Sequence, residues 1–196
     1  GDTNSTLAAA LVAAKLLVPL AHVEAGLRSF NKKMPEEINR LVTDAITNLF
    51  FTTSRSANNI LKCNGVNPEK IFFVGNTMID TLFHNLESLQ KPQFFDEIGM
   101  SEGGYVVLTL HRPANVDAES SFSRMLQAVS EAVRGLPVVF PVHPRTAATI
   151  AKLGKLPENI HLVDPQPYLE FNWLVKNSKA VITDSGGITE EATVMG

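Results

Sequence analysis

Short apolar runs alternate along the chain with longer stretches in which apolar residues recur every three or four positions. A short apolar run bounded by turn residues is typical of a buried strand, and the wider spacing is typical of a helix with one buried face. Strands that alternate with helices form parallel sheets, so we expect an α/β fold. The predicted strands are residues 18–23, 48–52, 71–74, 106–110, 137–142, 160–163 and 180–183.

One stretch interrupts this alternation. Residues 91–104 begin with Lys-Pro and end with Gly-Gly, which is the composition of a linker. We therefore predict two Rossmann-like parallel-sheet domains facing each other across a cleft. Residues 1–90 are the C-terminal part of the first domain, and residues 105–196 are the N-terminal part of the second. The first half opens at what looks like a strand end and the last helix breaks off at Gly196, so we expect an internal segment of a longer protein, with both domains incomplete.

The most polar stretch lies where the first predicted strand ends and the next helix begins. Glu24 directly follows the buried strand, and a carboxylate there needs a partner or a chemical role. Pro35 suits the first turn of a helix. Glu36 and Arg40 share a face of this helix, where a simple i,i+4 ion pair is the alternative to a role in a site. The apolar face that we expect to enter the core consists of Ile38, Leu41, Val42, Ala45, Ile46 and Leu49.

A second polar stretch follows the last predicted strand. Asp184-Ser-Gly-Gly joins that strand to a helix that we place near Ile188. Such a turn offers unpaired backbone N–H groups at the positive end of a helix dipole, which are the conditions for binding phosphate. We place Glu190 and Glu191 in the first helical turn, within reach of sugar hydroxyls. The alternative is an ordinary capped helix start with acidic residues that the dipole favours.

Two further polar pairs favour the phosphate interpretation. His111-Arg112 and His143-Pro-Arg145 follow neighbouring predicted strands, and sites in α/β proteins lie at the carboxyl ends of strands. His143 and Arg145 belong either to a second site or simply to the sheet edge.

The composition narrows the class of protein. A net charge of −3 and a pI near 6.0 argue against a nucleic-acid partner, which would require a basic face. The single cysteine, Cys63, excludes an internal disulfide and fits a reducing compartment, so we expect a cytoplasmic location. The longest apolar run, residues 7–20, contains Lys15 and is too short to span a bilayer, so no membrane partner is expected.

Seven motifs together resemble one family. They are Gly1-Asp-Thr, His22-Val-Glu-Ala-Gly-Leu-Arg, Pro35-Glu-Glu-Ile-Asn-Arg, Val74-Gly-Asn-Thr, His111-Arg, Pro141-Val-His and Thr183-Asp-Ser-Gly-Gly-Ile-Thr-Glu-Glu. In this order they closely resemble the non-hydrolysing UDP-N-acetylglucosamine 2-epimerases, and they extend over the whole chain. The resemblance implies the two-domain GT-B arrangement, with the active site in the interdomain cleft.

The resemblance also implies roles for individual residues. The catalytic residues would be Asp2, Glu24, Glu36 and His111, with His111 near the diphosphate. Tyr168 would join Gln166 and Phe171 in the uracil pocket. The substrate-binding residues would be Arg40, Arg112, Gln166, Phe171, Ser185, Gly186, Gly187 and Glu191.

The implied reaction interconverts UDP-GlcNAc and UDP-ManNAc. UDP is eliminated to leave a 2-acetamidoglucal, and it then adds back after the proton has returned to the other face of C2. One carboxylate must act as base and another as acid, and the sequence assigns neither role to a particular residue. The chain shows no metal-ligand cluster, so no metal or other cofactor is expected. The resemblance further implies a homodimer that serves the biosynthesis of cell-surface polysaccharides.

The chain departs from the family pattern in two respects. Ala114 stands where many members carry glutamate, and the family's N-terminal arginine loop and C-terminal arginine are missing. A first half without its opening strands would expose a sheet edge beside Val23, which is an aggregation site unless it is covered. We therefore expect residues 1–196 alone to be inactive.

Three other functions remain open. A 2-epimerase acting on a UDP-diacetamido-glucuronate would share most of the motifs, and a retaining GT-B glycosyltransferase would share the Gly-Gly turn and the ribose glutamate. A non-catalytic UDP-sugar-binding module is the third alternative. Three carboxylates in the first half favour epimerisation, because a transferase needs an acceptor site there instead.

Overall fold

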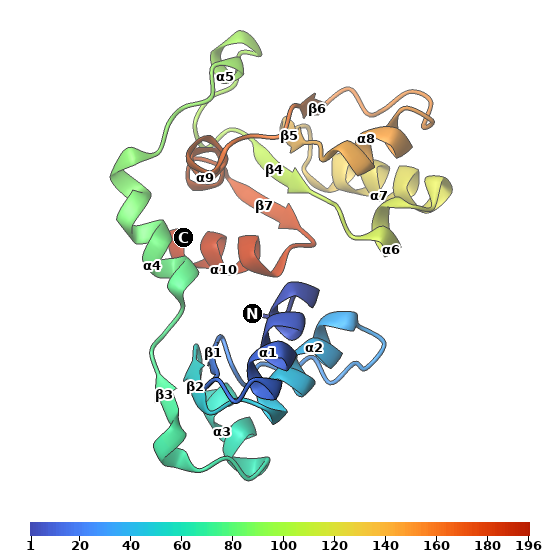
Figure 1. Ribbon diagram of the computed structural model, residues 1–196. Coiled ribbons are helices and arrows are strands. Elements are labelled where there is room, and N and C mark those ends of the chain that lie inside the picture. Colours follow the sequence, from blue (N-terminus) through green and yellow to red (C-terminus); the bar gives the residue numbers. More distant parts are fainter. The chain divides into compact units, whose positions relative to one another are not determined.

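The computed structural model describes residues 1–196 except for the side chain of Arg145, so this part of the predicted His143–Arg145 pair lies outside the described residues. The chain divides into two compact units, Gly1–Thr77 and Met78–Gly196. Each unit has its own parallel sheet with helices between the strands (Figure 1). The predicted α/β fold with two parallel sheets is therefore confirmed.

The first unit has a three-stranded sheet in the order β1-β2-β3. Its strands are β1 (Ala21–Val23), β2 (Leu49–Thr52) and β3 (Ile71–Phe73), and its helices are α1 (Asn4–Lys15), α2 (Pro35–Ala45), α3 (Arg55–Cys63) and the short 3₁₀ helix η1 (Pro68–Lys70). Consecutive parallel strands are joined by right-handed crossovers, so α2 and α3 lie on the same face of this sheet (Figure 1).

Local sequence signals set several of these boundaries. Thr3 caps α1 by accepting a hydrogen bond from the backbone N–H of Thr6, and Ser54 caps α3 in the same way from Ala57. Pro35 is the first residue of α2, as predicted. The first strand is shorter than the predicted range 18–23, because pairing with β2 begins only at Ala21.

The predicted apolar face of α2 is not its buried face. The buried residues of α2 are polar or charged: Glu37, Asn39, Thr43 and Asp44. Ile38 is 40% exposed, and Ala45 and Leu49 are also exposed. The prediction was wrong because Glu37, Asn39 and Asp44 have hydrogen-bond partners in β1 and in the segments that follow β1 and precede α1, and a buried polar group is stable when it is hydrogen-bonded.

The second unit has a four-stranded parallel sheet in the order β6-β5-β4-β7. Its strands are β4 (Val106–Thr109), β5 (Val138–Pro141), β6 (Ile160–Val163) and β7 (Ala180–Thr183). Its helices are α4 (Thr77–Asn85), η2 (Leu86–Ser88), α5 (Phe94–Glu97), α6 (Pro113–Val116), α7 (Glu119–Ala132), α8 (Pro144–Ile150), α9 (Tyr168–Lys176) and α10 (Gly186–Met195). From β4 the chain continues to β5 and β6 on one side, and β7 then lies on the other side of β4. The strand order therefore reverses between β4 and β7, and α/β folds bind ligands at such a reversal.

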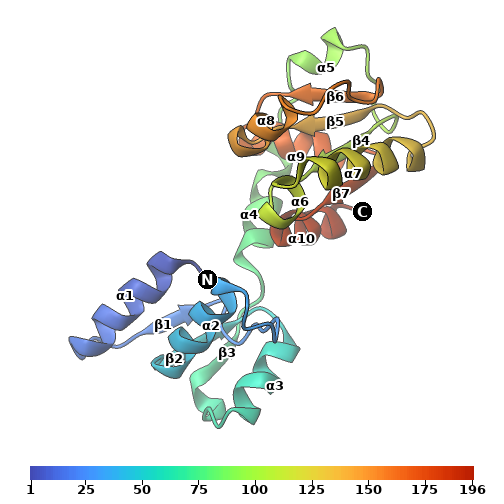
Figure 2. The same ribbon diagram turned by 90° about the vertical axis from the view of Figure 1, so that its right-hand side faces the viewer.

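Both faces of this second sheet are covered (Figure 2). Successive strand residues point to opposite faces. Val106 and Leu108 accordingly pack with α7, whereas Val107 packs with residues of α9 and α5. The result is a rigid apolar platform beneath the ends of β4 and β7.

The predicted linker at residues 91–104 contains the helix α5. Phe95 of α5 is buried and makes edge-to-face contacts with Tyr105 and Trp173, with ring centroids 5.2 and 5.0 Å apart. The division between the two compact units falls earlier, between Thr77 and Met78. The assignment of residues 1–90 and 105–196 to parts of two longer domains stays a prediction.

Within the described residues, no helix is both long and apolar enough to cross a membrane.

Candidate active site

Asp2 lies just before α1 and is held by two residues of α2. The guanidinium of Arg40 donates a hydrogen bond to the Asp2 carboxylate, and the Asn39 amide donates to the Asp2 backbone oxygen at 2.8 Å. Arg40 also donates to Glu37 at 3.2 Å. Burial alone would lower the pKa of Arg40, but the hydrogen bonds and charges of Asp2 and Glu37 raise it. The expected support of Asp2 by Arg40 thus has a direct geometric basis, whereas the partners of Arg40 are Asp2 and Glu37 rather than Glu36.

Glu24 follows β1 with an unusual backbone conformation. Its φ is +71°, in the left-handed region that non-glycine residues rarely adopt. Its carboxylate is 42% exposed, and the Oε2 atom lies 3.9 Å from the point where a side chain on Gly1 would begin. An accessible carboxylate therefore stands beside the loop that carries Asp2.

The turn after Glu24 requires glycine. Gly26 has a φ of +80°, and a Cβ atom there would lie 2.8 Å from the backbone oxygen of Ala57. Only a residue without a side chain lets this turn pack so closely against α3.

Glu37 has the structural role in this helix, and Glu36 does not. The Glu37 carboxylate is buried and accepts hydrogen bonds from the backbone and hydroxyl of Ser29, at 2.8 and 3.0 Å, and from the backbone of Phe30 at 3.1 Å. Burial raises the pKa of the Glu37 carboxyl, but these hydrogen bonds and Arg40 lower it below the usual value. Glu36 is exposed in the first turn of α2 and is free to face a ligand.

Asp44 is a residue that the sequence interpretation missed. Its buried carboxylate contacts His22 Nδ1 at 2.7 Å, the Arg28 guanidinium at 2.7 Å and the backbone N–H of Gly26 at 3.1 Å. The signal that could have revealed it is the spacing of Glu37 and Asp44, because residues seven apart share one helix face. The two carboxylates hold the two ends of the same loop.

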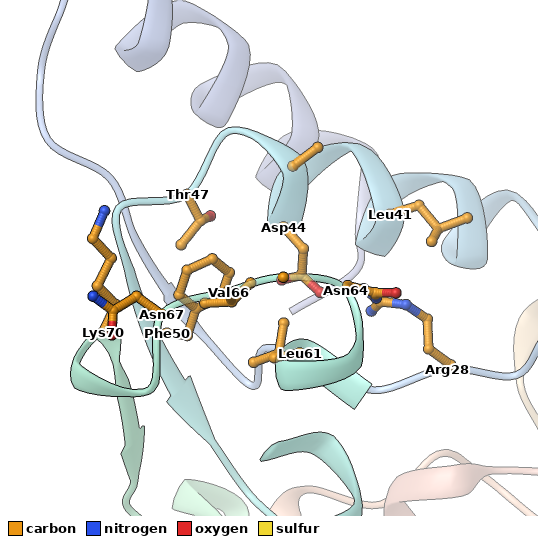
Figure 3. Close-up of a pocket in the computed structure, with 12 residues that line it drawn as sticks. Arg28, Leu41, Asp44, Thr47, Phe50, Leu61, Asn64, Val66, Asn67 and Lys70 are labelled. Carbon is orange, nitrogen blue, oxygen red and sulfur yellow. Dashed lines mark ion pairs between the residues drawn. The ribbon is translucent and has the colours of Figure 1, made fainter. Parts of the chain in front are cut away.

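A pocket of about 540 Å³ lies between α2 and α3 (Figure 3). Figure 3 labels Arg28 and Asp44 on its wall, together with Phe50, Leu61 and Lys70. None of the predicted site residues is in its lining.

In the second unit, His111 is oriented by Asp184. The imidazole Nδ1 of His111 lies 2.7 Å from the Asp184 carboxylate, which also accepts from the backbone N–H groups of His111 and Arg112 and from the Asn115 amide. Burial raises the pKa of the Asp184 carboxyl, but these hydrogen bonds and the histidine charge lower it. Asp184 therefore fixes the loop after β4 rather than facing a ligand, and the His111 side chain remains 53% exposed.

The Ser185–Gly187 turn has the geometry expected of a phosphate-binding helix start. Ser185 caps α10 by accepting a hydrogen bond from the Ile188 backbone at 3.4 Å. The N–H groups of Gly186 and Gly187 have no acceptor within the helix, because they lie in its first turn. The helix begins at Gly186, earlier than predicted, so Glu190 and Glu191 follow its first turn rather than lying in it.

A pocket of about 350 Å³ lies beside this turn. Tyr168 donates a hydrogen bond to the buried carboxylate of Glu191 at 3.0 Å, and burial together with this carboxylate raises the pKa of Tyr168 to about 12. The lining consists of Met78, Thr81, Tyr168, Ser185, Gly187, Ile188 and Glu191. The structure thus brings together the predicted phosphate, ribose and tyrosine positions.

Three other predicted binding residues lie outside this pocket. Gln166 lines a separate pocket of about 580 Å³ beside α5 and α8. Phe171 packs against the apolar cluster of Tyr105 and Leu174. Arg112 is exposed, with its backbone N–H bound to Asp184.

A family model described as UDP-N-acetylglucosamine 2-epimerase matches residues 1–196. The chain belongs to this family. The resemblance inferred from the seven motifs is therefore confirmed, and relatives of this chain are enzymes that bear that name.

Three similar proteins illustrate the relationship. The UDP-N-acetylglucosamine 2-epimerase of Methanococcus maripaludis is 44% identical over 207 residues. The alignment covers 100% of this chain and 56% of the length of that enzyme. The UDP-2,3-diacetamido-2,3-dideoxy-D-glucuronate 2-epimerase of Pseudomonas aeruginosa is 44% identical over 200 residues. The alignment covers 100% of this chain and 55% of the length of that enzyme. The crystal structure of Methanocaldococcus jannaschii UDP-GlcNAc 2-epimerase in complex with UDP-GlcNAc and UDP superimposes with a TM-score of 0.87 at 40% identity, covering 100% of this chain and 56% of that one. The chain spans about half the length of the curated relatives it matches.

Proposed function

We propose that the protein containing this chain interconverts UDP-GlcNAc and UDP-ManNAc by epimerisation at C2. The observation that carries the proposal is the accessible Glu24 carboxylate, held in a left-handed turn beside the loop in which Arg40 orients Asp2. The named activity of the relatives and the UDP-GlcNAc bound in the Methanocaldococcus jannaschii enzyme support the choice of substrate.

In the proposed elimination, a carboxylate removes the proton from C2 while the C1–O bond breaks and UDP leaves. The 2-acetamidoglucal then receives a proton at the opposite face of C2, and a diphosphate oxygen of UDP forms the new bond to C1. Asp2, Glu24 and Glu36 share the roles of base and acid. General acid–base groups of this kind contribute roughly 10²–10⁴-fold to the rate.

The second unit supplies the nucleotide site in this proposal. Ser185, Gly186 and Gly187 bind the diphosphate through backbone N–H groups and the helix dipole, and His111 stands near the same charge. Such preorganised donors stabilise the negative charge that develops on departing UDP. Glu191 binds the ribose hydroxyls, and Tyr168 faces the uracil. The resemblance adds Gln166 and Phe171, which lie outside the Tyr168 pocket, to the uracil contacts, and Arg112 as a further substrate contact. The proposal requires that one UDP-sugar reach both the carboxylates and this turn.

A second substrate is favoured by a specific observation. The Pseudomonas aeruginosa relative that is 44% identical bears the name of a UDP-diacetamido-glucuronate 2-epimerase. The same elimination and re-addition would act on that sugar, so both substrates belong in the test.

The resemblance also supports a homodimer that works in the cytoplasm and serves polysaccharide synthesis. Light scattering of the purified protein measures the assembly directly. A monomer under conditions of full activity would contradict the homodimer.

Proton NMR of the reaction in D₂O tests the proposed function. The protein containing this chain is offered UDP-GlcNAc or the UDP-diacetamido-glucuronate. We expect one of them to gain deuterium at C2 and to form its C2 epimer, because the returning proton comes from a group that exchanges with solvent. Release of free sugar without C2 exchange would indicate a hydrolase, and no reaction with either sugar would refute the proposal.

A further inference from the structure

Asp44 of α2 is a buried carboxylate with three donors and no place in the proposed chemistry. Its side chain is 6% exposed. It contacts His22 Nδ1 at 2.7 Å, Arg28 at 2.7 Å and the Gly26 backbone N–H at 3.1 Å. A buried charge is tolerated only when it is paired and hydrogen-bonded, and here each carboxylate oxygen has a charged or polar partner.

Two of these donors stand on either side of Glu24. His22 lies two residues before it and Gly26 two residues after it. A non-glycine residue in the left-handed region is strained and persists only where the surroundings fix it. Asp44 fixes the chain on both sides of Glu24, and the close packing of Gly26 against Ala57 prevents the turn from moving towards α3.

The same network reaches the loop of Asp2. The second ring nitrogen of His22, Nε2, lies 2.9 Å from the backbone oxygen of Gly1, the residue before Asp2. The Asp44 carboxylate is therefore connected to a side chain before Glu24 and to the backbone after it. Through the same imidazole it is connected to the residue before Asp2.

We propose that Asp44 is a positioning residue for the C2 epimerisation. It acts through His22 and the Gly26 amide to hold the Glu24 backbone in its left-handed turn and the Gly1 carbonyl beside Asp2. This inference rests on the proposed function. It assigns to Asp44 no proton transfer and no contact with the UDP-sugar.

Asp44→Asn in the protein containing this chain is the primary test. Asparagine has nearly the same shape, but it replaces one acceptor oxygen by a donor and leaves Arg28 without a counter-charge. Misplacing a catalytic group by about 1 Å can cost 10²-fold in rate, so we expect kcat to fall by roughly 10- to 100-fold. The KM for the sugar and the Kd for UDP should remain close to those of the unchanged protein, because nucleotide binding lies elsewhere.

Ile71→Ala in β3 is the matched control. The first unit has a small apolar core of Ala25, Phe50 and Leu61. Ile71 packs against this core and lies outside the Asp44 network. This variant should lower the thermal stability of the first unit without the loss of kcat. An equal loss of kcat in Ile71→Ala would mean that Asp44 acts only through stability, and the inference would be wrong.

The coupling to Glu24 gives the sharper readout. Residues that act as a unit are strongly non-additive. In the Glu24→Gln background, with C2 exchange followed over long incubations, Asp44→Asn should change the residual rate little. The same fold loss in both backgrounds would overturn the inference while leaving the proposed function intact. Absence of C2 exchange in the unchanged protein would instead refute the proposed function, and the inference would fall with it.

His22→Asn keeps the test decisive if Asp44→Asn does not fold. The asparagine amide can replace Nδ1 as the donor to Asp44, but it cannot reach the Gly1 carbonyl. We expect a smaller loss of kcat than for Asp44→Asn, with unchanged affinity for UDP. An unchanged kcat would contradict the proposed link to the Asp2 loop.

Discussion

The two units bury different kinds of side chain. In the first unit, the side chains buried at the centre include His22, Glu37, Asn39 and Asp44, and its apolar core cluster is the small one of Ala25, Phe50 and Leu61. In the second unit, apolar strand residues fill both faces of the sheet.

This difference matches what each unit would have to do. Proton transfer at carbon needs carboxylates held at defined places, and the first unit orients Asp2 and the Glu24 turn with buried hydrogen bonds. A phosphate site needs fixed backbone N–H groups, and a helix start at the end of a sheet packed on both faces by apolar side chains supplies them. The comparison predicts that substitutions in the two units will affect different steps.

The largest expected effect concerns Glu24. Glu24→Gln keeps the size of the side chain but removes its basicity. We expect kcat to fall by about 10³-fold, within the range of general acid–base catalysis, while the Kd for UDP is unchanged. Steady-state kinetics and calorimetry measure the two quantities. An equal loss in kcat and UDP affinity would mean that Glu24 is structural. It would contradict the prediction that substitutions in the two units affect different steps.

Glu37→Gln and Glu36→Gln form a matched pair on adjacent positions of α2. Glu37→Gln places an amide among donors from Ser29 and Phe30, so we expect the free energy of unfolding to fall by about 3 kcal/mol, as when a buried ion pair loses one partner. Glu36 is exposed, and its substitution should change stability by less than about 0.5 kcal/mol. Urea denaturation measures both. Equal effects would show that the buried polar face of α2 contributes no particular stability.

Gly187→Ala tests the second unit. A Cβ at this position would lie 2.8 Å from the terminal carbon of the Met78 side chain, which can move, but it would also stand in the way of a phosphate oxygen. We expect UDP affinity to fall by about tenfold, or about 1.4 kcal/mol. Gly154→Ala is the control, because nothing lies within 4 Å of a Cβ there. Calorimetry that finds equal UDP affinity in both variants would exclude Gly187 from the phosphate site.

The smallest effect is the pH dependence of stability. In the folded protein the pKa values of Glu37 and Asp184 lie below their ordinary values of 4.5 and 3.8. The unfolded chain therefore binds protons at higher pH, so this stabilisation is fully present above the ordinary pKa values and is lost as the pH falls through the folded ones. Urea denaturation between pH 7 and pH 3 should show this decline, with a shallower slope in Glu37→Gln. A slope as steep as that of the unchanged protein would exclude a contribution from Glu37.

Local signals in the sequence predicted most of the fold. The apolar runs at residues 160–163 and 180–183 identified β6 and β7, and Pro35 marked the start of α2. The caps at Thr3 and Ser54 are local signals of the same kind. These signals suffice because a strand run or a cap depends on residues within a few positions of each other. The seven motifs likewise identified the family.

The network that holds the site could not be predicted in the same way. Asp44 contacts His22, and Asp184 contacts His111, across separations in sequence that no local pattern encodes. The helical pattern placed Ile38 and Ala45 in the core, whereas the structure buries Glu37 and Asp44 and leaves those two apolar residues exposed. Whether a charged side chain can be buried depends on its partners, and only the folded chain brings those partners together.

The most direct test of the account is the rate of deuterium incorporation at C2 in Asp2→Asn. Proton NMR follows saturating UDP-GlcNAc in D₂O with the protein containing this chain, and calorimetry measures UDP binding on the same preparation. If the carboxylates of the first unit carry the proton transfer, Asp2→Asn will bind UDP as the unchanged protein does and will exchange C2 far more slowly. Exchange at the unchanged rate, or loss of UDP binding to the same degree as loss of exchange, would contradict the account.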